Sequence, residues 1–150
     1  MAEMDLAGFV GRPTGAGVVT VDRAIVSAFA EAVLDDNPVF RNREVATAAG
    51  FADIPVPPTF VFSAAQNWCQ WDEEQPPDPT GGMILHGEQS FTYHRPAVVG
   101  EKLHHHGVVR DVYTKQSGER TMTFMVIETT YTDADGAPVV TSTMNLLHRS

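Results

Sequence analysis

Acid–base chemistry in this sequence could draw on histidines that recur along one segment of its second half. His86 and His94 lie eight residues apart in a stretch that reads as one strand, so the alternation of side chains predicts that both share one face with Glu88. A general base taken from this pair, together with Asp35, is one interpretation. The alternative is that these histidines are structural polar residues on a solvent-facing or interface-facing surface.

A second group of histidines, His104 to His106, raises the question of a metal site. In a strand, residues 104 and 106 project to one side, but two imidazoles are an incomplete set of ligands. We therefore expect no metal, and nothing in the sequence calls for a cofactor. The single cysteine, Cys69, has no histidine or lysine near it in the sequence, so we expect a small buried side chain rather than a reactive thiol.

The composition argues against some classes of partner and against some cellular compartments. The 150 residues include 19 acidic and 10 basic ones, which gives a net charge of −9 that repels nucleic acid. The longest apolar run, residues 124–127, is far shorter than the roughly 20 residues of a membrane span. The N-terminus lacks the pattern of a signal peptide, and a single cysteine is typical of a reducing compartment. We expect a soluble, cytoplasmic protein with one domain, residues 1–150.

One stretch, residues 56–71, is expected to form the centre of the fold. Pro57 and Pro58 favour a helix start, because proline has a helical φ and lacks the N–H that a first turn leaves unpaired. The residues that follow are apolar on nearly every side of a helix, and a helix of that kind is buried. We therefore predict a long central helix here.

The remaining elements follow from periodicity and turn residues. Residues 8–15 contain too much glycine and proline for regular structure, residues 17–21 read as a short strand, and helices are predicted over 23–34 and 42–49, with Asp22 and Asn42 as caps. Four strands are predicted over about 83–94, 102–115, 120–133 and 138–148. A curled antiparallel sheet around one helix is the hot-dog arrangement of an α+β protein.

These segments carry a family resemblance. The matching pieces, in chain order, are Phe29-Ala30, Asp35 to Phe40, Ala48 to Gly50, Pro57 to Phe60, Leu85 to Gln89, Tyr93 to Pro96 with Gly100, and Phe124 to Asp133. The sequence resembles the MaoC-like dehydratases, which include R-specific enoyl-CoA hydratases and (3R)-hydroxyacyl-ACP dehydratases. It is most similar to their FAS1-type N-terminal half and to the small A/C-type subunits. The resemblance implies a hot-dog fold.

The resemblance also implies a site, and the sequence departs from it. The family's motif is Asp-x-Asn-Pro-x-His, in which the Asp and His hold a water for addition across an enoyl thioester. Asp35, Asn37 and Pro38 match, but Phe40 stands where the histidine is expected. Phenylalanine can neither donate nor accept a proton. Because Asp and Asn before a proline are also common turn formers, Asp35 has a purely structural reading as well.

A second departure concerns the start of the central helix. Active relatives carry His-Gly there and use a backbone N–H to bind the thioester oxygen. In this sequence Pro58-Thr59 replaces that pair. Because proline has no N–H, Thr59 or Phe60 is the first residue that could donate to the thioester oxygen. Phe60, Phe62 and Trp68 could line an acyl channel or serve only as core residues. His86 and Arg95 complete the substrate-binding residues that we predict.

The resemblance thus implies a non-catalytic, acyl-binding half of a hydratase or dehydratase that acts on CoA or carrier-protein thioesters. Its partner would be a catalytic hot-dog subunit or a second copy of itself, and basic residues such as Arg95, Lys102 and Arg110 would contact an acidic carrier protein. Two alternatives stay open. One is a homodimeric acyl-thioester binding protein without catalysis, and the other is an independent hydratase or thioesterase that uses His86 or His94.

Overall fold

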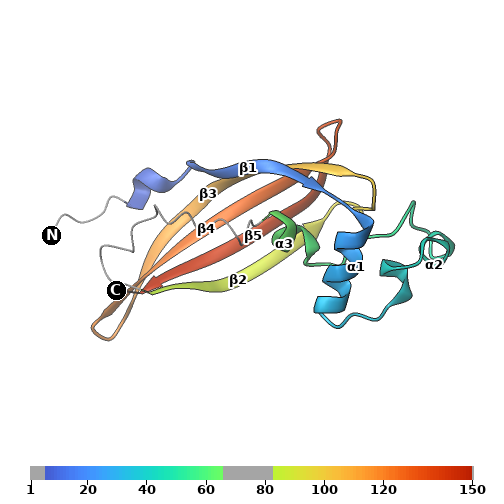
Figure 1. The fold of residues 1–150 in the computed structure, drawn as a ribbon. Coiled ribbons are helices and arrows are strands. Elements are labelled where there is room, and N and C mark those ends of the chain that lie inside the picture. Colours follow the sequence, from blue (N-terminus) through green and yellow to red (C-terminus); the bar gives the residue numbers. More distant parts are fainter. Residues whose placement is uncertain (1–5, 66–82, 150) are drawn as a thin grey trace.

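A five-stranded antiparallel sheet that curls past one short helix forms the body of the protein. The computed structural model describes residues 6–65 and 83–149 (Figure 1). Within these residues the elements are η1 (Leu6–Phe9), β1 (Pro13–Thr20), α1 (Arg23–Ala32), η2 (Pro38–Phe40), α2 (Arg43–Ala48), α3 (Phe60–Ala65), β2 (Met83–Tyr93), β3 (Lys102–Ser117), β4 (Arg120–Thr132) and β5 (Pro138–Arg149). No helix among them is long and apolar enough to cross a membrane.

The strand order is β1-β3-β4-β5-β2, and every neighbouring pair is antiparallel. Figure 1 shows α3 against one face of this sheet, while α1 and α2 gather beyond one end of it. We call the face toward α3 the inner face. The four strands predicted for the second half are confirmed to within two residues, and so is the hot-dog arrangement of sheet and helix.

The core lies between α3 and the inner face. Phe60 and Val61 from α3 are buried together with Leu103, Val139 and Val140 from the strands. The ring of Phe29 from α1 meets the ring of Phe60 edge-on at 5.6 Å between centroids. Apolar burial of this kind, worth roughly 25 cal/mol per Å², is what fixes α3 against the sheet.

The start of the central helix differs from the prediction. Pro57 and Pro58 are not its first turn, because α3 begins at Phe60 and the N–H of Phe60 bonds to the carbonyl of Pro57 at 3.0 Å. The prolines therefore form a turn that leads into the helix. The predicted continuation through Trp68 and Cys69 to residue 71 lies outside the described residues.

The expectation of irregular structure over residues 8–15 is wrong. Residues 6–9 form the helical turn η1, and β1 already begins at Pro13. A strand accepts proline at its first residue and glycine at a bulge when it lies at a sheet edge. β1 is such an edge strand, with a register shift between Pro13 and Gly15.

Candidate functional site

The segment from Asp35 to Phe40 connects α1 to η2 as a tight turn held by its own side chains. The Asp35 carboxylate accepts the N–H of Asn37 at 3.0 Å, and the Asn37 side-chain oxygen accepts the N–H of Val39 at 3.1 Å. Asn37 is thereby the cap of η2. Both polar residues of the predicted motif are engaged in building the turn, as the structural reading of this segment expected.

The backbone at the end of α1, just before this turn, has an unusual left-handed conformation. The end of α1 has the hydrogen bonds of a Schellman motif, from Leu34 N–H to Glu31 and from Asp35 N–H to Ala30. The position that usually holds glycine is Leu34, with a φ of 59°. A bulky residue in the left-handed region is strained by roughly 1 kcal/mol. This strained residue immediately precedes Asp35, whose own N–H is held by the carbonyl of Ala30.

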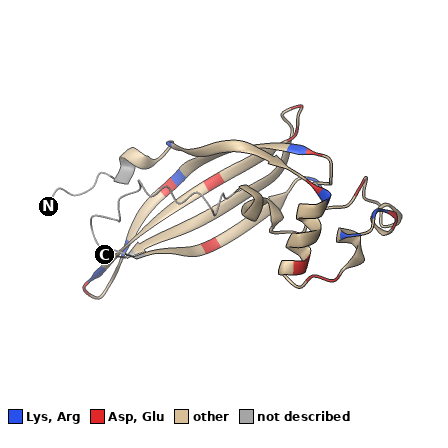
Figure 2. Cartoon of the chain, in the orientation of Figure 1, with Lys and Arg blue, Asp and Glu red and all other residues tan. Residues whose placement is uncertain are grey.

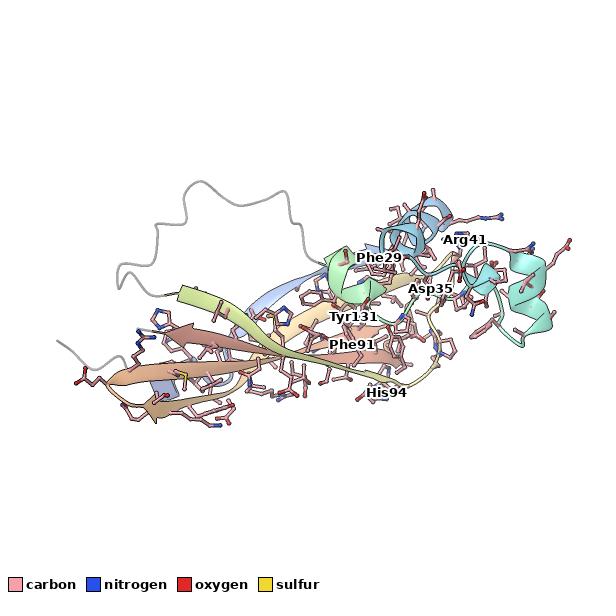
Figure 3. All side chains as sticks on the ribbon, turned by 90° about the horizontal axis from the view of Figure 1, so that it is seen from below. Phe29, Asp35, Arg41, Phe91, His94 and Tyr131 are labelled. Atoms are coloured by element: carbon pink, nitrogen blue, oxygen red, sulfur yellow. The ribbon has the colours of Figure 1, made fainter. Side chains whose placement is uncertain are left out.

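A cavity of about 690 Å³ lies beside this turn. Its wall comes from η2 and α2, from the segment before α3, and from the end of β2. The lining residues are Asn37, Val39, Phe40, Val45, Ala49, Phe51, Pro55, Val56, Pro58, Tyr93, His94, Arg95, Pro96 and Ala97. The structure thus brings together Asn37, Phe40 and Arg95 of the predicted site, together with His94. Asp35 is not among the lining residues; it lies at the turn, where its carboxylate accepts the N–H of Asn37 (Figure 3).

The polar groups of this cavity are engaged with the protein. The Tyr93 hydroxyl donates to the carbonyl oxygen of Pro58, and burial raises the pKa of Tyr93 to about 12. The Arg95 guanidinium lies 2.7 Å from Glu101 and 3.1 Å from Asp133, and hydrogen bonding to Glu101 is the main cause that raises the pKa of Arg95. The remaining wall is mostly apolar, and Phe40 packs from it against the core.

The start of α3 places the other predicted residues apart from this cavity. Phe60 is 1% exposed and belongs to the core, and its N–H is bound to Pro57. Thr59 is exposed, and its N–H has no acceptor within the described ranges 6–65 and 83–149. Phe62 faces a second cavity of about 220 Å³ on the inner face of the sheet. Trp68 is outside the described residues.

The expectation that His86 and His94 share a face is wrong. A bulge at Gly87 shifts the register of β2 on β5, so that His86 opposes Leu146 and Glu88 opposes Asn145. The His86 ring lies 5.3 Å from the Phe62 ring on the inner face. His94 instead contacts Thr141 at 2.9 Å, on the outer face (Figure 3). One extra residue reverses the alternation of a strand, and the two histidines cannot form one acid–base pair.

Histidines 104 to 106 follow the predicted alternation. His104 and His106 are exposed, whereas the ring of His105 lies 5.5 Å from that of Tyr131, toward the second cavity. Across the part of the chain that the structure describes, no group of three or more His, Cys, Asp or Glu side chains could hold a metal ion.

Two tyrosines with structural roles at the site were missed from the sequence. Tyr93 binds the carbonyl of Pro58, and Tyr131, buried on the inner face, donates to the carbonyl of Val61 at 3.2 Å. Tyr93 thus joins the turn before α3 to β2, and Tyr131 joins the first turn of α3 to β4. Their position in the predicted strands was visible in the sequence, but the carbonyls that they bind depend on how α3 crosses the sheet.

Relatives of known sequence agree with this architecture. The family model of the FAS1-like, dehydratase domain region matches residues 8–142. A UPF0336 protein of Parafrankia sp. (strain EAN1pec) is 36% identical over 146 residues, which cover 94% of this chain and 92% of that protein. A UPF0336 protein of Saccharopolyspora erythraea is 32% identical over 148 residues, with 94% and 89% covered.

Solved structures show the same fold. The C-terminally truncated HadBC (3R-hydroxyacyl-ACP dehydratase) complex from Mycobacterium tuberculosis contains a chain that is 26% identical, with a TM-score of 0.75 and 93% of this chain and 96% of that chain covered. A chain of the ChsH1-ChsH2 complex from the same organism has a TM-score of 0.73 at 22% identity, with 90% and 83% covered. These similarities confirm the resemblance and the hot-dog fold. The chain belongs to the family of the FAS1-like dehydratase domain region.

Proposed function

We propose that this chain is the non-catalytic, substrate-binding hot-dog subunit of a hydratase or dehydratase that acts on 2-enoyl or 3-hydroxyacyl thioesters of CoA or acyl carrier protein. The observation that carries the proposal is Phe40. It borders the 690 Å³ cavity at the position where the motif of active relatives has histidine. A site without that acid–base group loses a factor on the order of 10²–10⁴ in rate.

The chemistry of the cavity supports binding rather than proton transfer. Its wall is dominated by Val, Phe, Ala and Pro side chains, which suit the apolar part of an acyl thioester. The Tyr93 hydroxyl is protonated at neutral pH, as tyrosine ordinarily is, and burial raises its pKa further, to about 12. Arg95 is paired with two carboxylates, so its role in substrate binding is a proposal that rests on its place in the wall alone.

A partner would supply the missing histidine. The 3R-hydroxyacyl-ACP dehydratase with which this chain shares its fold is a complex of two different subunits. The free edge of β2 offers a place for such a subunit, because β2 pairs only with β5 among the described strands. An unpaired edge of this kind is a template for pairing with another chain. We therefore propose a second hot-dog chain as the partner.

One observation favours a second candidate, an independent hydratase or thioesterase. His94 borders the cavity and could act as a base there, although its ring already contacts Thr141. The purified chain would then turn over an enoyl-CoA, and His94→Ala would abolish that turnover. Under the main proposal there is no turnover to lose.

Binding by the purified chain tests the proposed cavity. Ala49 lines it, whereas Ala48, one residue earlier and also exposed, does not. We expect calorimetry to show binding of trans-2-decenoyl-CoA that Ala49→Trp weakens by at least about tenfold, or 1.4 kcal/mol. The control Ala48→Trp should change the dissociation constant by less than about twofold. Equal effects of the two variants would contradict binding at this site.

Which of the two subunits carries the catalytic groups is tested on the assembled complex. With a partner subunit that carries the full Asp-x-Asn-Pro-x-His motif, mutation of the partner's histidine should abolish hydration. Asp35→Ala in this chain should change the rate less than about threefold, provided that the turn stays folded. A loss of hydration in the Asp35→Ala complex comparable to that from the partner variant would place catalysis in this chain.

A further inference from the structure

The outer face of the sheet, opposite α3, changes from polar to apolar along its length. Toward the end beside α1 it carries threonines, among them Thr130 of β4 and its partner Thr141 of β5 (Figure 1). Toward the hairpin between β3 and β4, the residues on this face are Tyr113, Phe124 and Leu147, which are consecutive partners on β3, β4 and β5. The face of an antiparallel sheet that points away from the core is normally polar. This apolar row is therefore unusual for a surface that meets only water.

The alternation of side chains along β4 places the row on the outer face. Ile127 borders the second cavity, on the inner face, and β4 pairs with β5 without a register shift over this stretch. Phe124, three residues before Ile127, therefore projects from the opposite face. Met122 and Val126, two residues to either side of Phe124, project from that outer face as well. The apolar surface thus extends beyond the row along β4.

The side chains of the row hold one another in place. The rings of Tyr113 and Phe124 stack with 9° between their planes and 4.9 Å between their centroids. The Asn145 amide donates a hydrogen bond to the Tyr113 hydroxyl at 3.2 Å. Most of the length of β4 and β5 carries no Lys, Arg, Asp or Glu, as Figure 2 shows. The row is thus a preformed apolar surface, which loses little conformational entropy when another surface covers it.

Two residues of opposite charge flank the row on β3. Asp111 lies two residues before Tyr113 and Lys115 two residues after it, so both project from the outer face. The Lys115 ammonium lies 5.5 Å from the centroid of the Tyr113 ring and 5.4 Å from that of Phe124. Both charged residues are exposed, and neither forms an ion pair with another residue in the part of the chain that the structure describes.

A second copy of the chain is complementary to this patch. A two-fold axis that lies along the row brings the rows of both copies into contact and reverses the direction of the strands. Each residue two positions before the row then faces the residue two positions after it in the other copy. On β3 this arrangement sets Asp111 opposite Lys115 at two points, and on β4 it sets Val126 opposite Met122 at two points.

We propose that the outer face around Tyr113, Phe124 and Leu147 is a two-fold interface between copies of this chain. Burial of the apolar row drives the association, and the pairs of Asp111 with Lys115 fix its orientation. Because few side chains form the contact, we expect weak, reversible association with a dissociation constant on the order of 100 µM. The interface lies on the central strands and uses no residue of the cavity beside Phe40, so it does not depend on the proposed acyl-thioester function.

Charge reversal at the exposed positions tests the interface while it leaves the apolar row intact. In analytical ultracentrifugation of the full chain, Lys115→Asp and Asp111→Lys should each weaken association at least about tenfold, because like charges then face each other at two points. The control Lys102→Asp makes the same charge change at the first residue of β3 and should have less than about a twofold effect. If the chain also pairs at the edge of β2, the same comparison applies to the step from dimer to tetramer. Absence of an association step that responds to these charges, or equal effects of Lys115→Asp and Lys102→Asp, would overturn the proposal.

The two-fold symmetry predicts that two combinations restore association. The double variant Asp111→Lys with Lys115→Asp again sets opposite charges against each other, and it should associate within about threefold of the native chain. An equimolar mixture of the two single variants should form the mixed dimer, because both flanking charges of one chain are then opposite to those of the other. Failure of either combination to restore association would refute the two-fold arrangement.

Discussion

At the scale of single residues, Tyr131 on the inner face links the sheet to α3. Tyr131 is buried and donates to the carbonyl of Val61, and it also contacts the imidazole of His105. The pKa of Tyr131 is raised to about 12, mainly by burial, so the hydroxyl remains a donor over the whole physiological range. Tyr131 thereby positions α3, which borders the second cavity.

Tyr131→Phe removes this hydrogen bond and keeps the ring. The carbonyl of Val61 then loses its side-chain donor, and we expect the free energy of unfolding to fall by about 1 kcal/mol. Urea denaturation followed by circular dichroism measures this change. An unchanged midpoint would show that the hydroxyl does not stabilise the start of α3.

The lowered pKa of His105 predicts that the free energy of unfolding depends on pH. Its pKa is lowered in the folded state, first by burial and then by the charge of His106. The unfolded chain therefore takes up the proton more readily, and the stability due to neutral His105 is present above the ordinary histidine pKa of about 6.5 and lost as pH falls below it. His105→Gln should reduce the difference in unfolding free energy between pH 7.5 and pH 5.5.

The control for this prediction is His104→Gln, which removes an exposed imidazole from the neighbouring position of β3. If both variants reduce the pH difference equally, the effect does not come from the buried histidine.

At the scale of elements, the end of α1 carries a strain that the fold tolerates. Leu34 has a φ of 59° and is 90% exposed, so its side chain gains little from packing. Glycine adopts this conformation without a clash, and it is the residue usually found there. The strained turn delivers Asp35 and Asn37 to their hydrogen bonds, which in turn place Phe40 at the cavity.

Leu34→Gly should therefore stabilise the protein by about 0.5–1 kcal/mol, as a higher denaturation midpoint would show. The control is Val33→Gly, because Val33 has a φ of −90° and gains nothing from glycine. That variant should be destabilised by a similar amount, since glycine adds entropy to the unfolded chain. A lower stability of Leu34→Gly would contradict the assignment of strain.

Elements were more predictable from the sequence than the faces that they present. The cap residue Asp22 correctly predicted where α1 begins, and turn residues predicted the ends of the last four strands to within two residues. Both signals are local in the sequence. The Gly87 bulge was not predictable, since a glycine within a strand looks the same whether or not it shifts the register. That one residue decided which side of the sheet receives His86. Asn37 and Phe40 were found at the cavity, whereas Tyr93 and Tyr131 depend on tertiary contacts.

At the scale of the whole molecule, the sheet has two free edges among the described strands, β1 and β2. The β2 edge carries the apolar side chains Ile84 and Leu85, which are 63% and 40% exposed. Exposed apolar residues on an unpaired edge are typical of a surface that another chain covers. This is the edge at which we place the proposed partner.

A charge at that edge should disrupt the assembly. We expect Leu85→Lys to shift the chain toward the monomer, or to weaken its association with a partner by at least about tenfold, because the lysine loses hydration when the edge is covered. Analytical ultracentrifugation measures both. Leu34→Lys is the control, since Leu34 is exposed at the end of α1. Equal association of the two variants would place the interface elsewhere.

We propose that Phe40 makes this chain a binding subunit without its own acid–base group. The most direct test is hydration of a short and a long trans-2-enoyl-CoA by the purified chain, with the Phe40→His variant assayed beside it. We predict no turnover by the native chain and measurable hydration by Phe40→His, because the rest of the turn and the cavity are already in place. Clear turnover by the native chain would contradict the account, and would direct attention to His94 at the same cavity.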